Sequence, residues 1–167
     1  MNLYLLRHGL AVEPGTRGYS RDADRPLTPK GEGKLLKIAD AMKALGLQFD
    51  RVLFSPYVRA RGTAVIIAKE LGLEKILQKC DALTPGGSLR GVVDVLNHLK
   101  PAAENVLLVG HEPSMSELAA LLTSGETTVS ITLRKGGLCK LTAETLRPGR
   151  CASLEWLLTP KQMNLMG

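Results

Sequence analysis

Leu3-Tyr4-Leu5-Leu6-Arg7-His8-Gly9 opens the chain with four consecutive apolar side chains that run directly into a basic turn. A second turn of the same design comes later, where the mostly apolar segment Asn105–Val109 leads into Gly110-His111-Glu112-Pro113. Both runs are typical of buried strands, and α/β sheets bind their ligands beyond the carboxyl ends of such strands. We therefore expect the two imidazoles to share one site.

The composition is that of a soluble globular protein, and we expect a single domain over residues 1–167. Hydrophobic residues make up 44% and charged residues 23% of the chain, and its length suffices for a core without disulfide or metal. The net charge of +6 is spread along the chain, and only 4% of residues are aromatic. This pattern disfavours nucleic-acid binding, and a basic pocket for phosphate is enough to account for the positive charge.

The cysteines predict neither a disulfide framework nor a zinc site. Cys80, Cys139 and Cys151 are odd in number and form no C-x-x-C pair, which fits the reduced cytoplasm. The apolar run before Arg7 lacks the basic segment and the cleavage site of a signal peptide, and no stretch is long enough to span a membrane. We expect a cytoplasmic monomer with no membrane partner.

Short apolar runs alternate with amphipathic stretches, which is typical of the α/β class. Gly/Pro turns join the last strands, so we expect a mixed sheet that is antiparallel in part. A long polar loop covers residues 13–26. The expected strands are 3–6, 51–54, 74–77, 105–109, 127–133, 137–142 and 151–159. The expected helices begin at the Thr28-Pro29 and Ser55-Pro56 caps and end before Gly46 and Gly72, with further helices over 88–100 and from Pro113 to Gly125.

Three turns carry the residues that suit phosphate chemistry. They deliver Arg7 with His8, Ser55 with Arg59, and His111. Helix N-termini that follow two of these turns attract anions, and guanidinium groups match phosphate oxygens in geometry and charge. A cation in the first turn of a helix is unfavourable without an anion, which favours a functional Arg59. The turns therefore predict a site for phosphoryl transfer.

The ordered motifs resemble the histidine phosphatase superfamily, also named the phosphoglycerate mutase-like fold, and within it the small SixA-type phosphohistidine phosphatases. The resemblance covers most of the chain and implies a three-layer α/β/α architecture around a central mixed sheet. The matching segments are Leu6-Arg7-His8-Gly9, Asp24-Arg25-Pro26-Leu27-Thr28, Ser55-Pro56-Tyr57-Val58-Arg59-Ala60 with Thr63, Leu83-Thr84-Pro85-Gly86-Gly87, and Gly110-His111-Glu112-Pro113.

The resemblance implies that His8 is the nucleophile that takes the phosphoryl group, while Arg7, Arg59 and His111 hold the phosphate oxygens. No cofactor or metal is implied, and three histidines are too few for a metal phosphatase. A nucleophilic imidazole must be neutral, and neighbouring guanidinium charges depress its pKa. We also expect its other ring nitrogen to donate to a backbone carbonyl near Gly9.

The chain departs from the larger members of the superfamily, which place a carboxylic acid between the second and third motifs to protonate a leaving alkoxide. Asp81 is the plausible candidate here. An imidazole leaves with little help, so a phosphohistidine protein of a signalling or phosphorelay pathway is the expected substrate. The alternative is a small-molecule phosphomonoesterase that uses Asp81 or a loop aspartate as acid. A module that only binds phosphohistidine is a third reading, which the four intact catalytic positions disfavour.

Four further positions are candidates for phosphate or substrate binding: Gly9, Arg25, Ser55 and Glu112. Arg25 either reaches the phosphate or pairs with Asp22 or Asp24. Ser55 is chiefly an N-cap, with contact to phosphate as a second role. Glu112 either orients His111 or caps the following helix, and capping is favoured. His98 has no partner motif and is expected to be structural.

Overall fold

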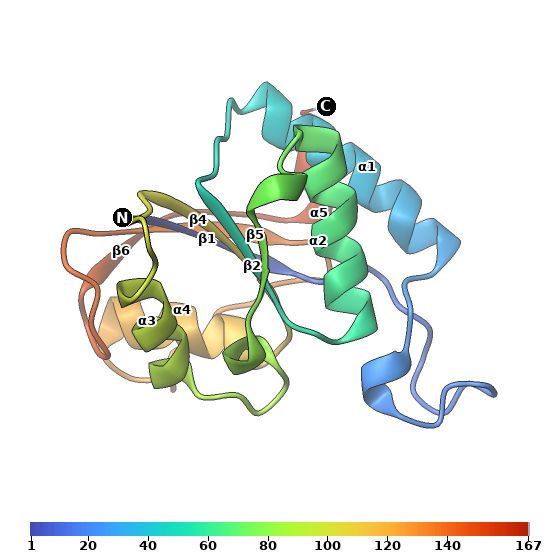
Figure 1. The fold of residues 1–167 in the computed structure, drawn as a ribbon, viewed down its shortest axis with the longest axis horizontal. Coiled ribbons are helices and arrows are strands. Elements are labelled where there is room, and N and C mark those ends of the chain that lie inside the picture. The colour runs from blue at the N-terminus through green and yellow to red at the C-terminus, as the bar shows by residue number, and fades with distance from the viewer. Residues whose placement is uncertain (167) are drawn as a thin grey trace.

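The computed structural model describes residues 1–166, which form one six-stranded sheet in the order β3-β2-β4-β1-β5-β6 (Figure 1). The four strands β3, β2, β4 and β1 run parallel, whereas β5 is antiparallel to β1, and β6 is antiparallel to β5. The predicted mixed sheet is therefore confirmed. The strands are β1 (Asn2–Arg7), β2 (Arg51–Phe54), β3 (Leu77–Lys79), β4 (Asn105–Gly110), β5 (Leu138–Ala143) and β6 (Ala152–Leu158).

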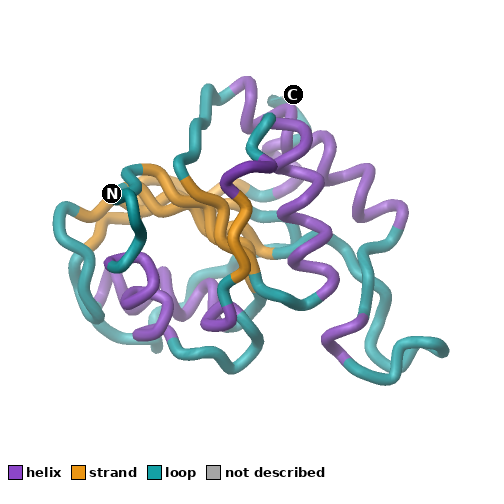
Figure 2. The backbone as a smooth tube through the Cα atoms, viewed as in Figure 1, coloured by secondary structure: helices purple, strands orange, loops and turns teal. Residues whose placement is uncertain are grey.

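Helices cover both faces of the sheet and give the three expected layers. Figure 1 shows α1 (Pro29–Ala44), α2 (Val58–Leu71) and α5 (Pro160–Met163) on one face. The other face is covered by α3 (Leu89–Asn97) and α4 (Ser114–Ser124), and Figure 2 shows the strands between the two groups. Short 3-10 turns are η1 (Asp22–Asp24), η2 (Glu74–Ile76) and η3 (Asp81–Leu83).

The central strands divide their side chains between two hydrophobic cores. Leu3 and Leu5 of β1 pack into the core under α3 and α4, whereas Tyr4 and Leu6 pack into the core under α1 and α2. Parallel strands with helices on both faces are apolar at every position, which explains the uninterrupted run in β1.

The predicted Thr28 cap is confirmed, the α3 helix begins with a cap that was not predicted, and one predicted cap is wrong. The Thr28 and Ser88 hydroxyls accept hydrogen bonds from Gly31 N and Gly91 N at the starts of α1 and α3. The helix predicted from Ser55 instead begins at Val58 with Tyr57 as N-cap. The Ser55 hydroxyl accepts a long hydrogen bond from Tyr57 N at 3.4 Å, which lies before the helix, and is also hydrogen bonded to His111.

Two predicted strands and one predicted helix end are also wrong. Residues 74–77 form η2 followed by β3, because the chain joins β2 only from Leu77 onward. Residues 127–133 form no strand, because the structure pairs them with none of the described strands and Leu133 is buried as a single side chain. The helix predicted over 88–100 ends at Asn97.

The polar loop of residues 13–26 extends away from the sheet and returns to it (the blue segment near α1 in Figure 1). An isolated bridge between Ala11 and Leu27 holds its base, and Val12 N donates to Pro26 O at 3.0 Å. The loop therefore returns to its starting point with η1 near its end. Within the described residues, no helix combines the length and the apolarity needed to cross a bilayer.

Candidate active site

The candidate site lies at the carboxyl ends of three adjacent parallel strands. His8 follows β1, Ser55 follows β2 and His111 follows β4, and β4 lies between the other two strands. The backbone N–H groups of His8 and Ser55 donate to Gly110 O and Val109 O, each at 3.0 Å. The sheet itself thus fixes the backbone that carries the two imidazoles.

His8 is buried, and its hydrogen bonds define which ring nitrogen is free to react. Its Nδ1 lies 2.7 Å from Gly9 O, which confirms the expected bond to a carbonyl near Gly9. A carbonyl only accepts, so Nδ1 carries the proton and Nε2 keeps its lone pair. Nε2 accepts a hydrogen bond from Arg59 Nε at 3.1 Å.

The surroundings of His8 keep its ring neutral. They lower its pKa to about 4, chiefly through burial and then through the positive charges of Arg59, Arg7 and Lys135, against the opposing effect of the Gly9 hydrogen bond. The sequence pattern attributed this shift to guanidinium charge. The predicted lowering of the pKa is correct, but burial is its larger cause. Sequence spacing could not show this, because it does not reveal how deeply the ring lies.

His111 lies beside His8, with the ring centroids 5.1 Å apart. Its Nε2 is 2.8 Å from Ser55 Oγ, and its ring forms a T-shaped pair with the Tyr57 ring, with the centroids 5.2 Å apart. Burial is the main cause that lowers its pKa to about 3, followed by His8 and the charge of Arg59. Its Nδ1 is buried and has no hydrogen-bond partner within residues 1–166.

Arg59 lies in the first turn of α2 and is only 4% exposed. Its guanidinium group donates through Nε to His8, through Nη1 to Asp22 O at 2.7 Å, and through Nη2 to Asp22 Oδ2 at 2.8 Å. Asp22 therefore supplies the anion that a cation in the first turn of a helix requires.

Asp22 is the central residue that the sequence did not identify as part of the site. Besides Arg59, it accepts hydrogen bonds from Arg25, with Arg25 Nε 2.8 Å from Asp22 Oδ1. The sequence named Asp22 only as an alternative partner of Arg25, and that alternative is the one present. The pKa of Asp22 is lowered, because the hydrogen bonds and charges of the two arginines outweigh the opposing effect of burial.

Arg7 lies next to His8 in the chain, but its side chain is hydrogen bonded to a residue outside this cluster. Its Nη1 donates to Leu133 O at 2.9 Å, while its Nε is buried without a partner among the described residues. The side chain also lines a hollow of about 740 Å³. Burial lowers the pKa of Arg7, and Glu112 partly opposes this effect.

The remaining candidates have structural contacts. Glu112 accepts hydrogen bonds from Ser116 N at 3.0 Å and Ser116 Oγ at 2.6 Å, and so supports the start of α4 as the favoured reading predicted. Gly9 N donates to Thr63 Oγ1 at 3.0 Å. Asp81 is exposed and pairs with Lys79 Nζ at 3.2 Å. Among residues 1–166 we find no group of three His, Cys, Asp or Glu side chains that could hold a metal ion.

Comparison with known proteins identifies the family. The profile of the histidine phosphatase superfamily (branch 1) matches residues 3–83. An uncharacterised protein of Picosynechococcus is 38% identical over 149 residues, which is 88% of each chain. The phosphohistidine phosphatase SixA homolog of Haemophilus influenzae is 34% identical over 131 residues, or 73% of this chain and 77% of that protein.

A solved structure of the protein histidine phosphatase SixA, complexed with tungstate, has the same fold. It superposes with a TM-score of 0.81 at 26% identity and covers 96% of this chain and 98% of that one. Together with the profile match and the Haemophilus relative, this places the chain in the histidine phosphatase superfamily, as a phosphatase of the SixA type.

Proposed function

We propose that this phosphatase hydrolyses phosphohistidine on a protein of a signalling or phosphorelay pathway, through a covalent intermediate on His8. One observation carries the proposal. The bond from His8 Nδ1 to Gly9 O leaves a lone pair on Nε2, and this nitrogen lies against the Arg59 guanidinium in a basic site. The names of the SixA relatives support the same substrate class.

In the first step, His8 Nε2 attacks the phosphorus, and the bond between phosphorus and the substrate imidazole breaks. The substrate ring leaves as neutral imidazole when its other nitrogen is protonated. In the second step, water attacks the phosphorus of the intermediate and the bond to Nε2 breaks. Inorganic phosphate is released with one proton of the water, the second proton passes to solvent, and His8 returns to its neutral form.

The cations supply the electrostatic part of the reaction. Negative charge on the phosphoryl oxygens is complemented by Arg59 and by Arg7, whose buried Nε is a donor without a protein partner among the described residues. His111 lies 5.1 Å from His8 between ring centroids, within reach of the same oxygens. These four side chains are our proposed catalytic set.

The carboxylates near the site support an imidazole leaving group over an alkoxide. Asp22 has a lowered pKa and is ionised, so it is a poor proton donor. Glu112 has a pKa raised by burial but is bonded to Ser116, and Asp81 pairs with Lys79. Without a positioned acid to protonate the leaving alkoxide, hydrolysis of an alkyl phosphate lacks a rate enhancement of about a hundredfold or more.

The test compares a phosphohistidine peptide with an alkyl phosphate, using wild type and His8→Ala, with His98→Ala as the matched control. We expect the peptide to react at least about a hundredfold faster. A labelled donor should leave an acid-labile adduct on wild type and on His98→Ala but not on His8→Ala. Faster turnover of the alkyl phosphate would indicate a small-molecule phosphomonoesterase. Wild type without adduct, with unchanged behaviour of His8→Ala, would indicate a binding module.

A further inference from the structure

A basic hollow of about 740 Å³ opens next to the candidate site, and apart from Arg7 its lining residues have no role in the chemistry described above. Arg7 forms part of its wall, and four more cationic side chains line it. No acidic residue is among the described residues that line it. We define this basic hollow by Arg7, Lys34, Arg134, Lys135 and Lys161.

Four separate parts of the chain build the basic hollow, and one of them is β1, which carries Arg7. Lys34 comes from α1, Lys161 comes from α5, and Arg134 and Lys135 come from the turn before β5. Buried Met163 anchors α5 in the core that α1 also covers. The cationic side chains are therefore brought together by the tertiary structure and do not form one continuous charged stretch of sequence.

The turn that carries Arg134 and Lys135 is attached to the strand that presents the nucleophile. Gly136 N donates to Arg7 O at 3.0 Å and to His8 O at 3.2 Å, and Arg7 N donates to Gly137 O at 3.1 Å. Gly136 has φ +78°, a conformation that side chains rarely adopt. These bonds hold the basic hollow in a fixed position beside His8.

The charges of the basic hollow are largely available to a ligand. Lys34, Arg134 and Lys161 are exposed. Lys135 has one anionic neighbour, Glu13 Oε1 at 3.9 Å, and that carboxylate belongs to a side chain that is 79% exposed. An exposed ion pair at this distance is weak and is readily exchanged for another anion.

From these observations we infer that the basic hollow docks an acidic segment of the protein that carries the phosphohistidine. This inference rests on the proposed function. Exposed lysines on separate elements suit a broad anionic surface, because an ammonium group acts as a point charge without the bidentate geometry that fixes one phosphate. The apolar side chains of Leu10 and Pro160, which also line the basic hollow, suit a peptide chain.

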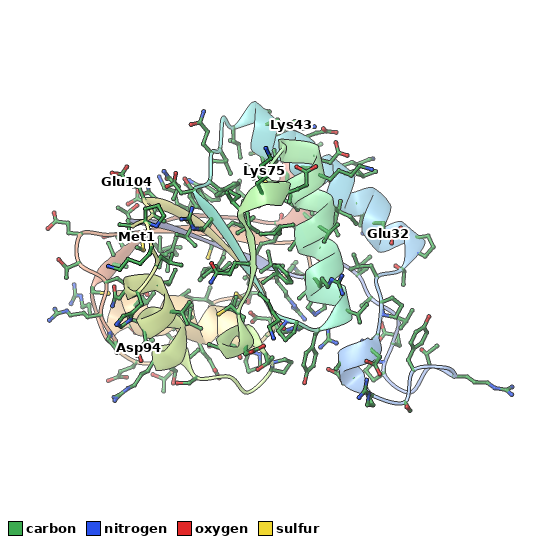
Figure 3. All side chains as sticks on the ribbon, viewed as in Figure 1. Met1, Glu32, Lys43, Lys75, Asp94 and Glu104 are labelled. Atoms are coloured by element: carbon green, nitrogen blue, oxygen red, sulfur yellow. The ribbon has the colours of Figure 1, made fainter. Side chains whose placement is uncertain are left out.

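Two phosphohistidine peptides test the inference, one with Asp and Glu beside the phosphohistidine and one with Asn and Gln in their place. We expect wild type to prefer the acidic peptide by about tenfold in kcat/KM at low salt, and the preference to shrink as salt rises. The double variant Lys34→Glu/Lys161→Glu should abolish the preference. The control Lys69→Glu/Lys75→Glu has the same net charge. Its two positions are exposed and lie in the last turn of α2 and in η2, where Figure 3 labels Lys75.

Binding of the same acidic peptide with an unphosphorylated histidine, followed by fluorescence anisotropy, separates this inference from the proposed function. Docking predicts binding to wild type and to the control variant, with at least about fivefold weaker binding to Lys34→Glu/Lys161→Glu. This result would uphold the docking site even if neither phosphopeptide were hydrolysed. Equal binding to all three proteins, equal loss in the control, or tighter binding of a single-stranded oligonucleotide through the same lysines would overturn it.

Discussion

At the scale of single residues, one backbone carbonyl decides which nitrogen of His8 reacts. Gly9 O accepts a hydrogen bond from the protonated Nδ1, and Thr63 Oγ1 accepts one from Gly9 N. Thr63 also donates to Arg59 O at 2.8 Å, so the same side chain connects the turn after β1 to the helix that carries Arg59. The orientation of the nucleophile and that of its cationic neighbour are therefore coupled through α2.

Asp22 places a negative charge beside the Arg59 guanidinium, which we propose binds the phosphoryl group, and this charge should weaken the binding of phosphate. In Asp22→Asn, an oxygen acceptor remains for Arg25 while the charge is lost. We expect inorganic phosphate to inhibit the variant about fivefold more strongly at low salt, which corresponds to about 1 kcal/mol for a half-exposed charge. The measurement is the inhibition constant of phosphate at several ionic strengths.

Asp24→Asn is the control for this prediction, because Asp24 lies in the same 3-10 turn but pairs with exposed Arg21. Its inhibition constant should match that of wild type. Weaker inhibition of Asp22→Asn would mean that the carboxylate serves mainly to hold Arg59 in position, and that this role outweighs its repulsion of phosphate.

At the scale of elements, the start of α1 is pressed against the turn that follows His8 and Gly9. Thr28 N donates to Leu10 O at 3.0 Å, and a Cβ added at Gly31 would lie 2.1 Å from that same oxygen. Gly31→Ala must move the helix or the turn, so we expect a loss of about 2 kcal/mol or more in the free energy of unfolding. The measurement is urea unfolding together with activity.

Gly33→Ala is the matched control on the same helix. A Cβ at Gly33 meets nothing within 4 Å, and alanine restricts the unfolded chain more than glycine does. We expect this variant to be more stable by about 0.5–1 kcal/mol. A stability change of the same sign and size in both variants would refute the close approach of α1 to Leu10.

The sequence predicted the elements best where burial on both faces leaves a continuous apolar run. Residues 51–54 and 105–109 are strands within one residue of the predicted bounds, and the carboxyl ends of these strands carry the predicted motifs. It failed over 127–133, because Val129, Ile131 and Leu133 alternate with polar residues as in a strand but find no neighbouring strand within the described residues. The β-propensity of a segment does not show whether a neighbouring strand is available to pair with it.

The sequence predicts that three residues of the candidate site lie close together, but it identifies neither Asp22 nor the hydrogen bonds that connect the site. Motifs at strand ends identify His8, Arg59 and His111, whose proximity the structure displays. The bridge from Asp22 to Arg59 could not be derived, because it joins the polar loop to the first turn of α2 across a separation that sequence spacing does not encode. Burial as the main cause of the pKa shifts is likewise a property of the folded chain.

At the scale of the whole molecule, the folded chain keeps two imidazoles neutral at a place where burial opposes their protonation. His8 and His111 are 6% and 2% exposed and lie at the strand ends between the two hydrophobic cores. Neither residue can take up a proton without placing a charge next to Arg59 in a poorly hydrated site. Folding is therefore linked to deprotonation of the same two groups that we propose for catalysis.

This linkage predicts that stability decreases in mildly acidic solution. Unfolded, each ring binds a proton near pH 6.5, whereas in the folded chain the pKa is about 4 for His8 and about 3 for His111. The contribution is complete above pH 6.5 and is lost as the pH falls toward the folded values, by about 2 kcal/mol per ring at pH 5. Urea unfolding at pH 7 and pH 5 measures the effect.

Between these pH values, the free energy of unfolding of His8→Asn/His111→Asn should fall by about 4 kcal/mol less than that of wild type. The control His98→Asn, which removes an exposed ring, should follow wild type. Identical losses in all three proteins would mean that the two rings are protonated as readily in the folded chain as in the unfolded one, and the neutral nucleophile that the proposed mechanism requires would then be lacking below neutral pH.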